Sequence, residues 1–159
     1  MAKAPSTAAR VRRPRAAAPS AWLGLPAGAT VLVDTAPFIY MLEDHPTLAP
    51  RFVGLFEAER RGELTIAITP VTVAELLVGP LKAGQDGLAR RYERELQAYA
   101  LVPIDAMLAA QAARLRVRYG LRLPDALQLA AALEIGASAV VTHDRDFAAV
   151  DGIQVITGE

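Results

Sequence analysis

Residues 31–43 read VLVDTAPFIYMLE, and this stretch, in which an apolar run ends at a carboxylate, decides the fold. Its first three residues suit a strand that is covered on both faces, as in a parallel sheet flanked by helices. Thr35 is predicted to cap the helix that follows, and Pro37 fits the first turn, where a missing N–H costs nothing. Asp34 would then lie at the carboxyl end of a strand, where open α/β sheets bind their ligands. The alternative for Asp34 is a structural role as a helix cap.

The same succession of strand and helix recurs along the chain. Further strands are expected at residues 64–69, 101–104, 139–141 and 153–156. Helices are expected between them at residues 46–61, 71–78, 83–99, 105–119 and 124–133. This alternation is typical of a βα-wound parallel sheet with helices on both faces. The sequence therefore predicts an α/β fold, a three-layer α/β/α sandwich with a central, mostly parallel sheet of about five strands.

Two prolines refine this prediction. Gly79-Pro80 is expected to end the helix at 71–78, because proline cannot continue a helix at low cost. Pro103 removes one donor from the ladder of its strand, so that strand is expected near an edge of the sheet.

Length and composition indicate one globular domain. With 159 residues, of which 53% are hydrophobic and 21% charged, the chain can bury a sizeable core. Residues 1–28 show no periodic apolar face and are predicted to form a disordered basic tail, followed by a domain at 29–159. The absence of cysteine excludes disulfides, thiolate metal ligands and a cysteine nucleophile. No apolar run approaches the roughly 18 residues of a membrane span, so we expect a cytoplasmic protein without a membrane role.

The formal net charge of zero hides an asymmetry. Residues 1–30 carry five basic residues and no acid, which leaves 12 basic residues against 17 acidic ones in the remainder. A domain this acidic is not expected to bind nucleic acid through a broad basic face, since such binding depends on many phosphate contacts. If phosphate is the substrate, a cation should mediate the contact.

Three more acids occupy positions comparable to that of Asp34. Glu75 is the only charge in a helix that is apolar nearly all round, and a buried carboxylate is costly unless it is paired or bound to metal. Asp125 lies in the first turn of a helix whose only other polar residue is Gln128, so its end is expected to open into a cleft. Asp144 follows the strand at 139–141. The structural alternatives are a narrow exposed stripe for Glu75 and a favourable helix N-terminal charge for Asp125.

These four acids are expected to share one pocket, because the carboxyl ends of parallel strands face the same way. Two carboxylates about 4 Å apart repel by about 4 kcal/mol at an effective dielectric near 20, so such a cluster requires a cation. With oxygen ligands only, Mg²⁺ or Mn²⁺ is the natural choice. A metal of this kind attracts a phosphodiester and activates water. The sequence therefore predicts hydrolysis of a nucleic-acid backbone.

Four stretches resemble the PIN-domain nucleases, and most closely the VapC-type toxins of bacterial type II toxin–antitoxin systems. They are DTAPFIY at 34–40, PVTVAEL at 70–76, LPDA at 123–126 and THDRDF at 142–147, in the order and spacing of that family. The resemblance spans about residues 31–156. It implies a PIN-like α/β/α sandwich and a Mg²⁺- or Mn²⁺-dependent endoribonuclease that cleaves RNA. It also implies a homodimer that a cognate antitoxin protein holds inactive.

The resemblance assigns roles to the four acids. Asp34 and Asp125 are the expected direct metal ligands. Glu75 and Asp144 complete the catalytic cluster, and their contact with the metal is expected to pass through water.

The residues around these acids are assigned in the same way. Thr35 and Thr142 are expected to support the cluster with their hydroxyls. Asp146 is ambiguous, since it either shares the role of the fourth acid or points away. His143 occupies a position where the family often has asparagine, and it is expected to serve the loop and not catalysis. The basic tail is outside the family pattern.

Other classes of protein fit less well. A phosphoacceptor receiver domain relies on a lysine near the last strand, whereas the last lysine here is Lys82. A phosphatase with a D-x-D nucleophile pair requires an acid where Ala36 stands. The remaining alternative is a catalytically inactive PIN-like module that binds RNA or a protein. A binding module has no reason to keep a self-repelling cluster of four acids.

Overall fold

Five parallel strands form the central sheet in the computed structural model, which describes residues 22–158. The strands are β1 (Ala29–Val33), β2 (Leu64–Ile68), β3 (Ala100–Leu101), β4 (Ala139–Val141) and β5 (Gln154–Ile156). Their order is β3-β2-β1-β4-β5, and every neighbouring pair is parallel. The expected strand number and direction are thus confirmed, and β3 lies at the edge as Pro103 predicts.

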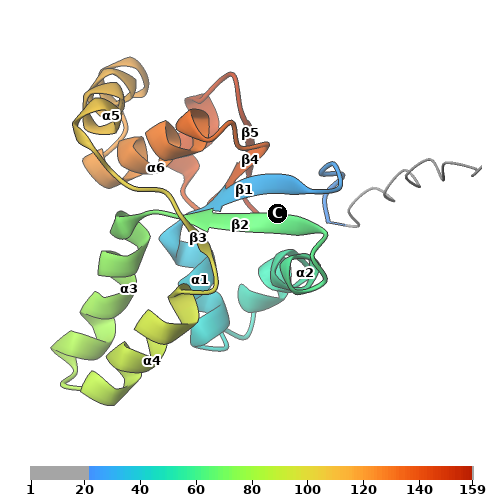
Figure 1. Ribbon diagram of the computed structural model, residues 1–159, viewed down its shortest axis with the longest axis vertical. Coiled ribbons are helices and arrows are strands. Elements are labelled where there is room, and N and C mark those ends of the chain that lie inside the picture. The colour runs from blue at the N-terminus through green and yellow to red at the C-terminus, as the bar shows by residue number, and fades with distance from the viewer. Residues whose placement is uncertain (1–21, 159) are drawn as a thin grey trace, which may run out of the picture.

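Helices cover both faces of this sheet. They are α1 (Thr35–Leu42), α2 (Ala49–Arg60), α3 (Pro70–Lys82), α4 (Asp86–Leu96), α5 (Ala106–Tyr119) and α6 (Leu123–Glu134), with the 3-10 helix η1 (Arg145–Ala149) before β5. In Figure 1, α1 to α4 lie on one side of the strands and α5 and α6 on the other. This is the predicted three-layer α/β/α sandwich. Among the described residues, no helix is long and apolar enough to cross a membrane.

The apolar core has two layers, one on each face of the sheet. Val31 and Val33 of β1 pack with the cluster that contains residues of α1 to α4. Leu32, between them, packs with the cluster of α5 and α6. All three are fully buried, because successive side chains of a strand point to opposite faces and helices cover both.

The predicted tail lies mostly outside the described residues. Nothing in the structure bears on residues 1–21. Within residues 22–28, Trp22 is buried and Leu25 is 1% exposed, so these residues pack on the domain. The indole of Trp22 contacts α2 at Gly54 so closely that a Cβ at Gly54 would lie 2.7 Å from Trp22 Cδ1.

Two local expectations are wrong. The cap of α1 is Asp34 and not Thr35, because the Asp34 carboxylate accepts a hydrogen bond from the Thr35 N–H. Helix α3 does not end at Gly79 but continues through Pro80 to Lys82. Pro80 is buried and α4 packs against α3, so tertiary packing offsets the hydrogen bond that the proline removes.

Strand register places three polar residues side by side at the carboxyl edge of the sheet. Leu32 pairs with Ala67 of β2, and Val33 pairs with Val141 of β4. Continuing these registers past the strand ends aligns Asp34 with Thr69 on one side and Thr142 on the other. The buried, apolar strands therefore end in a row of polar side chains at one edge of the sheet, where the helices begin.

Candidate active site

A cavity of about 760 Å³ opens at this edge of the sheet. All four acids that the sequence analysis selected line the cavity, namely Asp34, Glu75, Asp125 and Asp144. Thr35 lines it as well, and Thr142 lies directly behind, hydrogen-bonded to Asp34. The structure thus brings all six residues together from β1, α1, α3, α6 and the segment after β4. Their roles in metal binding and catalysis stay predictions.

Asp34 is the most constrained of the acids. It is 8% exposed, and its Oδ1 accepts a hydrogen bond from the Thr35 N–H at 2.7 Å. Its Oδ2 accepts one from the Thr142 hydroxyl at 2.8 Å. Burial raises the pKa of Asp34, the charges of Glu75 and Asp144 add to the rise, and the hydrogen bonds from Thr35 and Thr142 oppose it. A nearby cation would favour the ionised form of this carboxyl.

Gln128 is a site residue that the sequence analysis noted without giving it a role. Its Nε2 lies 3.4 Å from Asp34 Oδ1 and donates to Thr72 Oγ1 at 2.8 Å, while its Oε1 accepts from Thr69 Oγ1 at 2.9 Å. Gln128, Thr69 and Thr72 are all fully buried. The sequence did contain a signal for this role. Gln128 is an uncharged polar residue in an apolar helix, and a buried amide requires hydrogen-bond partners.

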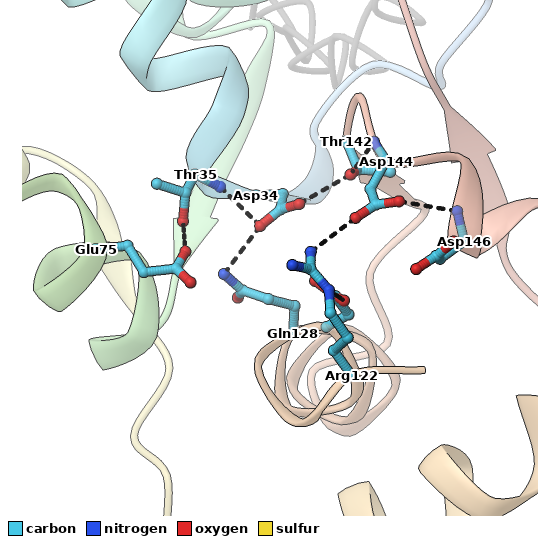
Figure 2. A network of polar contacts seen from close by, with 9 residues as sticks. Asp34, Thr35, Glu75, Arg122, Gln128, Thr142, Asp144 and Asp146 are labelled. Atoms are coloured by element: carbon cyan, nitrogen blue, oxygen red, sulfur yellow. Dashed lines mark hydrogen bonds and ion pairs between the residues drawn. The ribbon is translucent and has the colours of Figure 1, made fainter. Parts of the chain in front are cut away.

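Glu75 is exposed and does not occupy the buried position that its apolar helix suggests. Helix α3 leaves one side uncovered at the cavity, where Val78 is also exposed. The Thr35 hydroxyl donates a hydrogen bond to Glu75 Oε2, which ties the carboxylate to the start of α1. Figure 2 shows Glu75 on one side of Asp34, with Asp144 and Asp146 on the other.

Asp125, Asp144 and Asp146 form the tightest acidic group. One carboxylate oxygen of each lies within 4.8 Å of the others. Asp144 caps η1 by accepting a hydrogen bond from the Asp146 N–H at 2.9 Å. Asp146 is exposed but faces this group, so the structure places it beside Asp144 and not away from the site. Burial raises the pKa of Asp125.

Arg122 bridges two members of this group. Its Nε lies 3.0 Å from Asp125 Oδ2, and its Nη2 lies 2.9 Å from Asp144 Oδ2. The Arg122 charge partly offsets the rise in the pKa of Asp125, and the Asp125 charge in turn raises the pKa of Arg122. Figure 2 shows the guanidinium reaching from the start of α6 toward Asp144. Arg122 has no recognisable role in the sequence, because only the fold brings residue 144 within its reach.

The donor set fits a hard divalent cation. Asp125, Asp144 and Asp146 offer oxygen ligands at metal-binding spacing, and Asp34 and Glu75 line the same cavity outside that group. Carboxylate oxygens are the ligands that Mg²⁺ and Mn²⁺ prefer. Asp34 and Asp125 are buried acids with raised pKa values, and a bound metal would offset the cost of burying their charge.

One wall of the cavity is aromatic. His143 Nδ1 and the Tyr40 hydroxyl share a hydrogen bond of 2.7 Å, and both residues line the cavity. The two rings meet edge to face with centroids 5.4 Å apart. His143 thus fixes the loop after β4 to α1, in agreement with the expected loop role.

Comparison with known proteins supports the resemblance. The profile of the PIN domain matches residues 31–153, which is most of the chain. No match was found among curated protein sequences.

Solved structures with the same fold include toxin–antitoxin proteins. A toxin–antitoxin complex from Klebsiella pneumoniae is 27% identical, with a TM-score of 0.65 over 81% of this chain and 98% of the other. VapBC-5 from Mycobacterium tuberculosis is 27% identical, with a TM-score of 0.55 over 80% of this chain and 98% of the other. VapC20 from Mycobacterium tuberculosis, a sarcin–ricin loop cleaving toxin, is 17% identical, with a TM-score of 0.61 over 79% of this chain and 98% of the other.

The family match, the sheet order and the cluster of acids at the strand ends agree with one another. The chain belongs to the PIN-domain family, and the solved structures that share its fold include a member of the VapBC family of toxin–antitoxin systems.

Proposed function

We propose that this protein is a Mg²⁺- or Mn²⁺-dependent endoribonuclease and the toxin of a toxin–antitoxin system. The observation that carries the proposal is the convergence of Asp34, Glu75, Asp125 and Asp144 on one cavity. Membership of the PIN-domain family supports nuclease chemistry. RNA as the substrate is supported by the fold shared with VapC20, which cleaves the sarcin–ricin loop.

In this proposal Asp34 and Asp125 hold the metal, while Glu75 and Asp144 bind it through water. A divalent ion held by these residues would supply activation of water for attack on the phosphodiester and compensation of charge on the leaving oxygen. Asp34 is oriented for this task by Thr142 and by the Thr35 N–H.

In the same proposal Glu75 receives a proton. Its Oε2 accepts the hydrogen bond from Thr35, whereas its Oε1 makes no hydrogen bond within residues 22–158. An exposed carboxylate at the cavity with one unengaged oxygen suits a general base for the attacking water.

The decisive experiment measures cleavage of a structured RNA by the purified protein. We expect cleavage with Mg²⁺ or Mn²⁺, none with a chelator, and none for Asp34→Asn in either condition. Asp151→Asn is the control, because Asp151 is an exposed acid paired with Arg118 and does not line the cavity. Equal cleavage with metal, with chelator and by Asp34→Asn would refute metal-dependent catalysis at this site. No cleavage in any condition would leave an inactive binding module as the function.

The comparisons support one partner. The neighbours from Klebsiella pneumoniae and Mycobacterium tuberculosis belong to toxin–antitoxin systems, so we propose a cognate antitoxin. We also propose a cytoplasmic homodimer as the active form. Expression in a bacterial host should arrest growth, and co-expression of a small protein encoded directly upstream should restore it. Harmless expression of protein that is active in vitro would contradict the toxin role. Light scattering on the purified protein tests the dimer.

A further inference from the structure

Arg122 occupies the position between two carboxylates where a cation is required. Its two nitrogens reach different acids, Asp125 at 3.0 Å and Asp144 at 2.9 Å. No other cationic side chain forms an ion pair with either acid in the described part of the chain. In the protein without metal, the guanidinium therefore provides the positive charge that these carboxylates need.

We propose that Arg122 is the built-in counter-ion of the acidic site, and that a divalent cation must displace its guanidinium in order to bind. The inference rests on the metal site of the proposed function. A carboxylate oxygen that accepts a hydrogen bond from arginine is less available to a metal, and both Asp125 Oδ2 and Asp144 Oδ2 are engaged in this way. Metal binding then exchanges one counter-ion for another.

The exposure of Arg122 permits this exchange. Its side chain is 69% exposed, whereas the side chains of Asp125 and Asp144 are 6% and 27% exposed. The guanidinium can therefore turn into solvent while the two acids stay in place. Exposed side chains change rotamer on the picosecond-to-nanosecond timescale.

Two effects follow from this arrangement. Removal of the guanidinium should strengthen metal binding, because the metal no longer competes with an internal cation. It should also lower the stability of the metal-free protein, because the carboxylates of Asp125, Asp144 and Asp146 then repel one another without compensation. A general loss of structure would not produce the first effect.

The chain offers a matched control. Arg145 also lines the cavity and is exposed, but its side chain forms no ion pair within residues 22–158. Arg145→Gln removes the same charge from the same cavity as Arg122→Gln. Comparison of the two variants therefore distinguishes displacement of the Arg122 guanidinium from the general effect of one positive charge in the cavity. Arg122→Lys keeps the charge, but a single ammonium does not reproduce the fork that spans the two acids.

The experiment is a titration of each full-length variant with Mn²⁺ by calorimetry, combined with thermal unfolding in a chelator. We expect Arg122→Gln to bind Mn²⁺ about three- to fivefold more tightly than wild type, Arg122→Lys to lie between, and Arg145→Gln to stay within about twofold. In chelator, Arg122→Gln should unfold at a lower temperature than Arg145→Gln.

The outcomes separate this inference from the proposed function. Equal Mn²⁺ affinities for Arg122→Gln and Arg145→Gln, with wild type binding metal, would overturn the counter-ion role and leave the metal site intact. Failure of every variant to bind Mn²⁺ would overturn both. Binding by Arg122→Gln where wild type binds none would support displacement in its strongest form.

Discussion

The side-chain amide of Gln128 in α6, which is fully buried, lies 3.4 Å from the Asp34 carboxylate at the end of β1. Asp34 fixes the orientation of this amide, because only the NH₂ group can face a carboxylate. The amide oxygen must then face Thr69, whose hydroxyl donates to it and also caps α3. The position of Asp34 is thus coupled, through Gln128 and Thr69, to the start of α3, the helix that carries Glu75.

We predict that Gln128→Leu destabilises the protein by about 1–3 kcal/mol, because the buried hydroxyls of Thr69 and Thr72 lose a partner. Activity should fall by more than the loss of folded protein explains, since Asp34 loses one of its donors. Urea unfolding and cleavage assays on folded protein measure the two effects. Gln97→Leu, at an exposed position after α4, is the control and should change neither by much. Normal stability of Gln128→Leu would show that the network contributes little.

The sequence was sufficient to predict the strands and the acids at their ends. A strand such as 31–33 is buried on both faces, so its own residues reveal it, and the capping residue and proline that begin α3 are local features of the chain. Parallel pairing then brings the acids together without further information. For this reason Asp34, Asp125 and Asp144 could be assigned to one site before the structure was known.

The features that the sequence did not predict depend on contacts between elements. The burial of Glu75 was overestimated, because the composition of α3 does not indicate which of its sides the rest of the fold leaves open. The bridge from Arg122 to Asp144 joins residues from separate elements, and its partners are set by how α6 meets the end of β4. Pro80 stays helical because packing against α4 outweighs a local preference.

Replacement of Glu75 by glutamine tests the assignment of the general base. The amide keeps a hydrogen-bond acceptor for the Thr35 hydroxyl but cannot take a proton from water. Stability should change by less than about 0.5 kcal/mol, because the side chain is exposed. Activity should fall by about 10²- to 10⁴-fold. Near-normal cleavage by Glu75→Gln under single-turnover conditions would remove Glu75 from the chemistry.

The contact between Trp22 and α2 predicts a difference between two glycine substitutions. In Gly54→Ala the new methyl group would lie 2.7 Å from Trp22 Cδ1, so the indole must move. We expect a loss of about 1–2 kcal/mol, since the overpacking cost exceeds the gain in helix propensity. Gly87→Ala in α4 meets no atom within 4 Å and should leave stability unchanged or raise it by up to about 1 kcal/mol. Equal stabilities of the two variants would show that Trp22 does not pack at this position.

The raised pKa values of Asp34 and Asp125 predict how stability depends on pH. Burial raises both above the ordinary aspartate value of 3.8, so between that pH and the raised pKa values the folded chain binds more protons than the unfolded chain. The stabilising contribution of these two groups is therefore complete below pH 3.8 and is lost as the pH rises through the raised pKa values. Metal binds the ionised carboxylates, so stabilisation by Mn²⁺ should grow over the same range.

Urea unfolding in a chelator, from roughly pH 4 to roughly pH 7, measures this effect as a difference between variants. Asp34→Asn should lose less stability than wild type as the pH rises, because it removes a group whose folded pKa is raised. Asp151→Asn should follow wild type over this range, because a hydrogen bond from Tyr119 lowers the pKa of Asp151 and the contribution of that group changes mainly below pH 3.8. The two substitutions remove the same charge, one from a buried site and one from an exposed site. If both variants lose stability with pH in parallel, burial is not the cause of the raised pKa of Asp34.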